Sequence, residues 1–336
     1  MRIPDWFGEN FASIDNRIKS YDLLEKFVDQ IENFYPGTTE QHVLDLREEL
    51  SKLGNTEFAF LICHSGYIPE HYPPDSSNET LYTKLVELLV QDWAIRLDFT
   101  ESELPSQKSS KEDITIKDEE VVIVCDAKSF RLGRSQAVPN VKDVLKHADI
   151  EKWLSAYSDR KACGGLVTFP RQLDWKRGSD FYQYTTDHSS PTMCLFYEHL
   201  AFFLLKRLPK ERIISAFANY KSLFPEKVSK SMRNRDIYYD TIERYLFSDC
   251  LDEWIHFNGL SLQISKERAF HAHKTLDNMI EDIKCVIKKK YYQIDDIQYL
   301  REAVIESEVA GATKNLQKQK ECIIKFRDVS KDYINE

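Results

Sequence analysis

The pattern of apolar and polar positions predicts helices over about the first 57 residues. Apolar residues recur at helical spacing in NRIKSYDLLEKFVDQIENFY and in TTEQHVLDLREELSKL, with Thr39 as a candidate cap and Gly54 as a stop. A short apolar run, FAFLIC, then leads into a loop rich in proline and serine. From Asn78, NETLYTKLVELLVQDWAIRL predicts a strong amphipathic helix, and TESELPSQKSSKED predicts a polar connector.

A small sheet is predicted between about residues 110 and 205. ITI and VVIVCDAK flank a turn at KDEE, which indicates two hairpin-like strands, and the second is apolar on both faces and therefore central. A helix is expected from Asn140 to Tyr157 and a buried strand over 164–169. A last strand is expected to run into a helix within TMCLFYEHLAFFLLKRL.

The remainder of the chain after Pro209 has a helical pattern almost to its end. Leu276, Ile280, Ile283 and Ile287 follow one another at spacings of 4, 3 and 4, which is typical of a single buried stripe on a helix. No linker clearly divides the chain, so we expect one α/β domain over 1–336. It would comprise a helical N-terminal part (1–75), a core with the small mixed sheet (76–208) and a helical C-terminal part (209–336).

Composition and charge refine this picture in two respects. The chain is 42% apolar and 30% charged, as in ordinary globular proteins, and it shows neither a membrane-length apolar run nor a signal peptide, so a cytoplasmic protein with no membrane contact is expected. A net charge of −9 argues weakly against nucleic acid as a partner. Two locally basic stretches, 128–147 and 160–177, instead favour a basic cleft.

The end of the central strand carries the most informative polar residues. Asp126 and Lys128 project from the same face because side chains alternate along a strand, and charged groups there are costly unless something binds them. Mg²⁺ takes oxygen ligands and needs only one or two carboxylates, so Asp126, the carbonyl of Ala127 and the upstream Asp113 are candidate ligands. Lys128 would hold or deprotonate an attacking water, or bind the scissile phosphate.

D-x-K is a short pattern, and an interpretation without catalysis remains. The pair can be a structural strand end with a surface salt bridge, in a helical protein that binds DNA or acts as a scaffold. Nucleotide binding is not indicated, because CGGLV belongs to neither a G-x-x-x-x-G-K nor a G-x-G-x-x-G pattern, so no nucleotide cofactor is expected.

The stretch VCDAKSFRLGR resembles type II restriction endonucleases of the HindIII group, which carry a nearly identical D-A-K-S-F-R-L-x-R run. The similarity extends to SSNETLYTKLVELLVQDWAIRL, the NVKD segment, EKWLSAYSDRKA and LFYEHLAFFLL, in the same order. The resemblance implies a restriction-endonuclease-like, PD-(D/E)xK core with large helical additions. It also implies Mg²⁺ as cofactor and a homodimer that cuts palindromic double-stranded DNA.

The resemblance assigns roles to individual residues. Asp126 and Lys128 match the D-x-K acid and lysine, and Asp113 matches the upstream acid; Glu112 stands where the family has glycine and is an alternative ligand. The residues expected near the DNA are Arg131, Arg134, Asn140, Lys142 and Asp143. Asn pairs well with adenine, and Arg or Lys with guanine or phosphate. Arg131 packing under the loop remains open, as do two roles for Asp143, a second metal ligand or a helix N-terminal charge.

These expectations favour a Mg²⁺-dependent, site-specific endonuclease. The alternative is a DNA repair or recombination nuclease of the same fold with little sequence preference. Base choice by such an enzyme depends on side-chain reach and on the deformability of the DNA as well as on which residues are present.

Overall fold

The structure is a computed structural model of the 336-residue chain. It describes residues 2–33, 39–104, 112–119, 121–131, 141–157, 161–171, 181–186, 188–225, 228–229, 232, 234–292 and 297–324.

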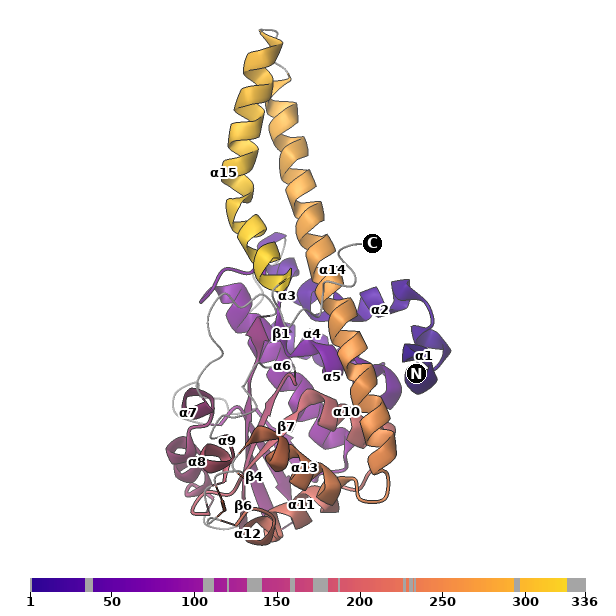
Figure 1. The fold of residues 1–336 in the computed structure, drawn as a ribbon, viewed down its shortest axis with the longest axis vertical. Helices are drawn as coiled ribbons and strands as arrows, with labels where there is room; N and C mark the ends of the chain where they lie inside the picture. The colour runs from indigo at the N-terminus through magenta and orange to yellow at the C-terminus, as the bar shows by residue number, and fades with distance from the viewer. Residues whose placement is uncertain are drawn as a thin grey trace.

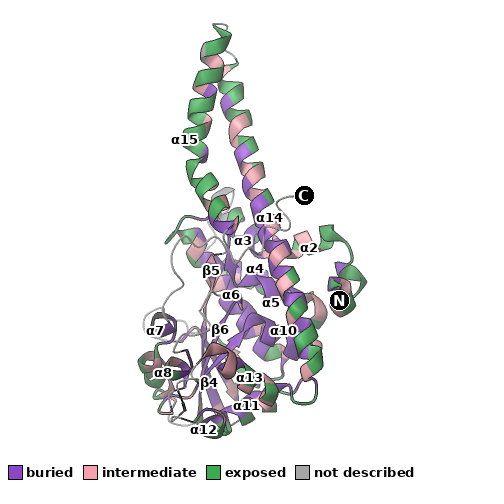
Figure 2. Cartoon of the chain, in the orientation of Figure 1, coloured by how far each residue is buried: buried purple, intermediate pink, exposed green. Residues whose placement is uncertain are grey.

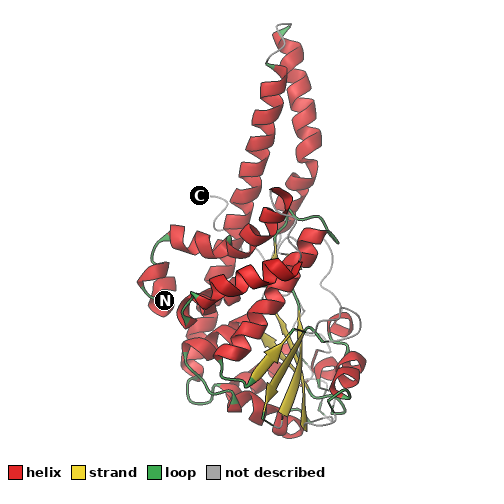
Figure 3. Ribbon diagram, turned by 180° about the vertical axis from the view of Figure 1, so that it is seen from behind, coloured by secondary structure: helices red, strands yellow, loops and turns green. Residues whose placement is uncertain are grey.

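A five-stranded mixed sheet forms the centre of the lower part of the molecule (Figures 1 and 3). Its order is β2 (Glu101–Glu103), β3 (Ile114–Asp118), β4 (Val121–Ala127), β6 (Lys161–Phe169) and β7 (Thr192–Phe196). The β2–β3 and β3–β4 pairs are antiparallel, whereas β4, β6 and β7 run parallel. The prediction that VVIVCDAK forms a central strand is confirmed over Val121–Ala127, whereas Lys128 follows the last residue of the strand. Burial of the strand on both faces explains the lack of alternation.

One glycine of β6 is required by its surroundings. The β4–β6 register shifts between Val122 and Ile123, where Ile123 pairs with Gly164. Gly164 has a φ of +154°, and a Cβ there would lie 2.2 Å from the carbonyl oxygen of Pro191. The first glycine of CGGLV is therefore needed because the strand is irregular here and leaves no room for a side chain.

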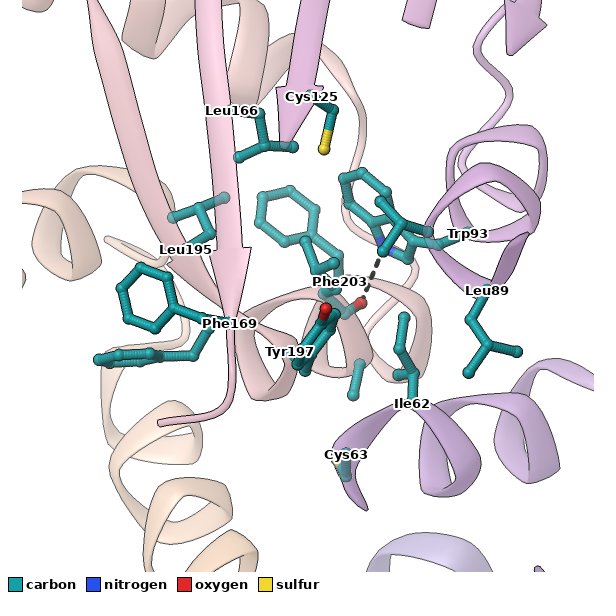
Figure 4. Packing of buried hydrophobic residues seen from close by; sticks show 14 of the residues in the cluster. Ile62, Cys63, Leu89, Trp93, Cys125, Leu166, Phe169, Leu195, Tyr197 and Phe203 are labelled. Carbon is teal, nitrogen blue, oxygen red and sulfur yellow. Dashed lines mark hydrogen bonds between the residues drawn. The ribbon is translucent and has the colours of Figure 1, made fainter. Parts of the chain in front are cut away.

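Helices cover both faces of the sheet. On the face of Cys125 and Leu166 lie α6 (Ser77–Arg96) and α10 (Tyr197–Leu205), joined by a 2.9 Å hydrogen bond from Trp93 Nε1 to the carbonyl of Leu200 (Figure 4). On the opposite face α8 (His147–Leu154) packs against β4 and β6. Its Ile150 lies so close to Gly165 that a Cβ there would be 2.7 Å away. The predicted helix over 78–97 is confirmed.

The N-terminal part consists of short helices, as expected. They are α1 (Ile3–Phe7), a 3₁₀ turn η1 (Glu9–Phe11), α2 (Ile14–Tyr21), α3 (Leu23–Asn33), α4 (Thr39–Ser51) and α5 (Asn55–Ser65). The FAFLIC run belongs to α5, which is buried from Phe58 to Ser65 and therefore lacks a polar face. It leads into β1 (Tyr67–Ile68), which pairs in parallel with β5 (Phe130–Arg131).

Two local predictions were wrong. The polar connector contains strand β2, whose Glu101 and Glu103 both form ion pairs with Lys117 of β3, at 3.1 and 2.9 Å. These cross-strand pairs allow a highly charged segment to extend the sheet. The single helix expected over 140–157 is two helices, α7 (Val141–Val144) and α8. The short helix α9 (Phe181–Thr185) precedes β7.

The C-terminal part is helical, as predicted, and ends in a long hairpin. Its helices are α11 (Glu211–Ala218), α12 (Tyr220–Leu223), α13 (Arg235–Leu246), α14 (Leu251–Tyr291) and α15 (Gln298–Ile324). The upper part of α14 projects from the body and pairs with α15 (Figure 1). Within the predicted stripe Leu276, Ile280 and Ile287 are buried and Ile283 is half-buried (Figure 2).

One continuous hydrophobic cluster runs from Ile3 to Ile264 and draws on all three parts of the chain. The division at residues 75 and 208 remains a prediction. Among the described helices, none has both the length and the apolar character needed to cross a bilayer.

Candidate active site

The charged pair predicted at the end of β4 is present. Asp126 is the penultimate residue of the strand and is 6% exposed. Its Oδ1 lies 2.7 Å from Nζ of Lys128, whose side chain is 32% exposed. The carboxyl ends of β4, β6 and β7 meet at this edge of the sheet, so the pair lies on a rim formed by three parallel strands.

Asp113 reaches the same point from the neighbouring strand. It directly precedes β3, and because β3 runs antiparallel to β4, the start of one strand lies beside the end of the other. Its Oδ2 accepts a 3.0 Å hydrogen bond from the main-chain N–H of Ala127. The upstream acid expected from the sequence therefore lies beside Asp126.

Glu112, the alternative upstream acid, has different partners. Its buried carboxylate accepts hydrogen bonds from the hydroxyls of Thr115, at 2.7 Å, and of Tyr157. These contacts hold it within the protein and favour Asp113 as the acid that serves the site.

Electrostatics makes this site receptive to a cation. Burial raises the pKa of Asp126 to about 7; the ion pair with Lys128 opposes the rise and the nearby carboxylate of Asp113 adds to it. Two carboxylates that repel each other in a poorly solvated place are stabilised by a divalent ion, which removes the repulsion.

Glu87 of α6 is a buried acid whose pKa responds to the charges of this site, and sequence reasoning missed it. Burial raises its pKa to about 7, and the charges of Asp113 and Asp126 contribute to that rise, so the three carboxylates share one electrostatic environment. Its Oε2 lies 2.5 Å from Nζ of Lys84. A signal existed: Glu87 interrupts the apolar run LVELLV, where an ionised side chain is costly without a partner.

The residues expected near DNA are only partly within the described residues. Arg131, in β5, forms a 3.1 Å ion pair with Glu79 and donates to the carbonyl of Pro69 at 3.3 Å, which agrees with the alternative in which it packs under the loop. The main chain of Lys142 and Asp143 lies in α7, but the structure does not describe their side chains. Arg134 and Asn140 lie outside the described residues.

The raised pKa of Asp126 predicts how stability depends on pH when divalent ions are removed. The folded state keeps a proton on this carboxyl up to about pH 7, whereas an unfolded Asp loses it near pH 4. The folded state therefore binds more protons between these limits, and its free energy of unfolding falls as the pH rises from about 4 to about 7. Asp126→Asn, which cannot titrate, should reduce this fall.

Urea unfolding in EDTA at pH 5.5 and pH 7.5 measures the effect. Glu87 and Glu198 have raised pKa values of the same sign, so the difference between wild type and Asp126→Asn is the informative quantity. If wild type and Asp126→Asn showed the same pH dependence of stability, the raised pKa of Asp126 would be contradicted.

The donor set fits a magnesium ion. Within the described ranges, no three His, Cys, Asp or Glu side chains are grouped to hold a metal by themselves. Mg²⁺ does not require this, since one or two carboxylates suffice and water or substrate phosphate completes the octahedron. Asp113 and Asp126 meet that requirement.

Comparison with known proteins finds restriction endonucleases. A family model described as HindIII restriction endonuclease matches residues 10–234. The type II restriction enzyme HindIII of Haemophilus influenzae is 28% identical over an alignment of 299 residues, which covers 84% of this chain and 89% of the relative. Among solved structures, the small subunit of the heterodimeric restriction endonuclease R.BspD6I covers 65% of this chain and 96% of its own, at 13% identity; its TM-score of 0.31 is too low to inform the fold.

Proposed function

The chain belongs to the HindIII restriction endonuclease family and is a type II site-specific deoxyribonuclease, and on this premise we propose that it cuts double-stranded DNA with Mg²⁺ at a palindromic site. The observation that carries the proposal is the convergence of Asp113, Asp126 and Lys128 at the end of β4. The match to residues 10–234 includes all three.

We assign the metal ligands from the same geometry. Asp113, Asp126 and the carbonyl of Ala127 would hold Mg²⁺, with Glu87 as a further carboxylate in their electrostatic environment. When bound, the ion activates a water molecule and neutralises the charge that develops on the phosphate. The protein's contribution is the pairing of the start of β3 with the end of β4, which keeps both carboxylates at the rim of the sheet.

Lys128 is the group that would act on the nucleophile or the phosphate. Its amine lies beside the Asp126 carboxylate, and its partial exposure leaves it accessible to substrate. From this position its ammonium form would donate a hydrogen bond to the attacking water or to the scissile phosphate, close to the developing charge. Deprotonation of the water would instead require the neutral amine, which takes up the proton.

DNA recognition is assigned to the segment that follows. Arg134, Asn140, Lys142 and Asp143 remain proposed DNA-binding or metal-linked residues on the strength of the family resemblance. Arg131 remains a candidate phosphate contact, although its ion pair with Glu79 would first have to open.

A homodimer is the proposed active form, since two-fold protein symmetry matches a palindromic site and lets each active site cut one strand. A cytoplasmic location, where cellular DNA is accessible in bacteria, is proposed with it.

Digestion of a sequenced plasmid with the purified protein and Mg²⁺ tests the proposal. We expect a few discrete fragments whose mapped ends share one palindromic sequence. A smear would instead favour the repair or recombination nuclease, an alternative that the family match does not support. No cleavage at any Mg²⁺ or Mn²⁺ concentration would overturn the proposed function.

A further inference from the structure

Tyr197, the first residue of α10, contacts the main chain of Lys128. Its side chain is fully buried, and its hydroxyl donates a 3.1 Å hydrogen bond to the carbonyl oxygen of Lys128. Figure 4 draws this tyrosine within the core, among residues of α5, β6 and β7. Burial raises the pKa of Tyr197 well above its usual value, so the hydroxyl stays protonated and remains a donor.

The other polar main-chain group of Lys128 is also held. Its N–H donates a 2.8 Å hydrogen bond to the carbonyl of Thr168 in β6. Lys128 lies beyond the last residue of β4, so strand pairing alone does not fix both of its main-chain groups. The bond from Tyr197 supplies the second anchor.

The ring of Tyr197 is itself tightly confined. A Cβ on Gly66 would lie 2.5 Å from Cε2 of Tyr197 and 2.9 Å from Cγ of Pro170. The carbonyl of Gly66 accepts a 2.9 Å hydrogen bond from the N–H of Phe130, two residues after Lys128. Gly66 has an ordinary φ of −69°, so it is the space and not the backbone conformation that requires glycine here.

We propose that Tyr197 is a positioning residue for Lys128: its hydroxyl fixes the Lys128 main chain and thereby the place of the amine beside Asp126 and the scissile phosphate. This assignment rests on the proposed function. Tyr197 does not touch the substrate; it acts through the lysine. Small displacements of a catalytic group reduce the rate of the chemical step without weakening substrate binding.

Tyr197→Phe removes only the hydroxyl and tests the assignment. The substrate is a duplex that carries the site mapped from the plasmid digest. We expect kcat to fall about tenfold. KM and Ca²⁺-supported DNA binding should remain within about twofold of wild type, because the groups that bind DNA are unchanged.

Tyr220→Phe is the matched control. Tyr220 is also buried, and its hydroxyl donates to the main-chain carbonyls of Thr185 and Thr192. Thr192 is the first residue of β7, so this contact lies at the amino ends of the parallel strands, whereas Lys128 lies at their carboxyl ends. Both variants should lose a similar amount of thermal stability. Only Tyr197→Phe should lose kcat, a difference that a merely structural role would not produce.

A second variant, Gly66→Ala, tests the same contact by changing the space around the Tyr197 ring. The methyl group of Gly66→Ala must displace the Tyr197 ring, so kcat should fall, and the additional loss in a Tyr197→Phe background should be much smaller. Wild-type kcat in Tyr197→Phe, or an equal loss in Tyr220→Phe, would overturn the assignment while the nuclease remains. A wild-type protein that cuts no DNA would overturn the proposed function and this assignment together.

Discussion

Asp126→Asn is expected to lower the rate of DNA cleavage by about a thousandfold or more, since metal-assisted charge stabilisation contributes several kcal/mol to such reactions. Asn keeps the size of the side chain but removes the negative charge that attracts the metal, and it cannot form the ion pair with Lys128. Site-specific binding in Ca²⁺ should remain largely intact, because phosphate and base contacts come from other residues. Single-turnover cleavage and a binding titration separate the two effects.

A matched pair of variants checks that the loss arises at this site. Asp113→Asn should reduce cleavage strongly, because its carboxylate lies at the N–H of Ala127. Glu112→Gln changes an adjacent buried carboxylate that is held by Thr115 and Tyr157, and it should retain most activity. Full cleavage by Asp126→Asn, or an equal loss in both members of the pair, would contradict the proposed metal site.

The strand of the proposed active site could be predicted from the sequence because its signals are local. VVIVC is apolar on both faces, which identifies a central strand, and the D-x-K spacing predicts Asp126 and Lys128 on one face of an extended segment. The two side chains do meet, at 2.7 Å, although Lys128 follows the last residue of β4. The position of Asp113 followed from the antiparallel hairpin, since one short turn joins the two strands. These parts of the prediction needed little knowledge of tertiary structure.

The rest of the site depends on contacts between distant segments. Glu87, which interacts electrostatically with the carboxylates, belongs to a helix that precedes the sheet, and Tyr197 reaches Lys128 across 69 positions of sequence. The ion pair that holds Arg131 likewise comes from Glu79, a residue of another element. Hydrophobic periodicity defines which face of an element is buried, but it does not say which residues meet at the edge of the sheet.

Lys128→Met is expected to lower kcat by about a hundredfold or more, as is usual when a positioned proton donor or acceptor is removed. Methionine keeps much of the aliphatic side chain and removes only the amine, so DNA binding in Ca²⁺ should change little. The loss of the ion pair also leaves the buried Asp126 without its nearest cation, which should raise the pKa of that carboxyl further. The remaining activity should therefore require a higher pH than in wild type.

Lys84→Met provides the control for this change. Lys84 is another lysine paired with an acid of the site, at 2.5 Å from Glu87, but the pair is an i, i+3 contact within α6. Loss of Lys84 should raise the pKa of Glu87 further, but it leaves the ion pair of Asp126 with Lys128 intact, so kcat should stay within about fivefold of wild type. A larger loss in Lys84→Met than in Lys128→Met would transfer the catalytic role to Lys84, and the rim of the sheet would then serve only to hold the metal.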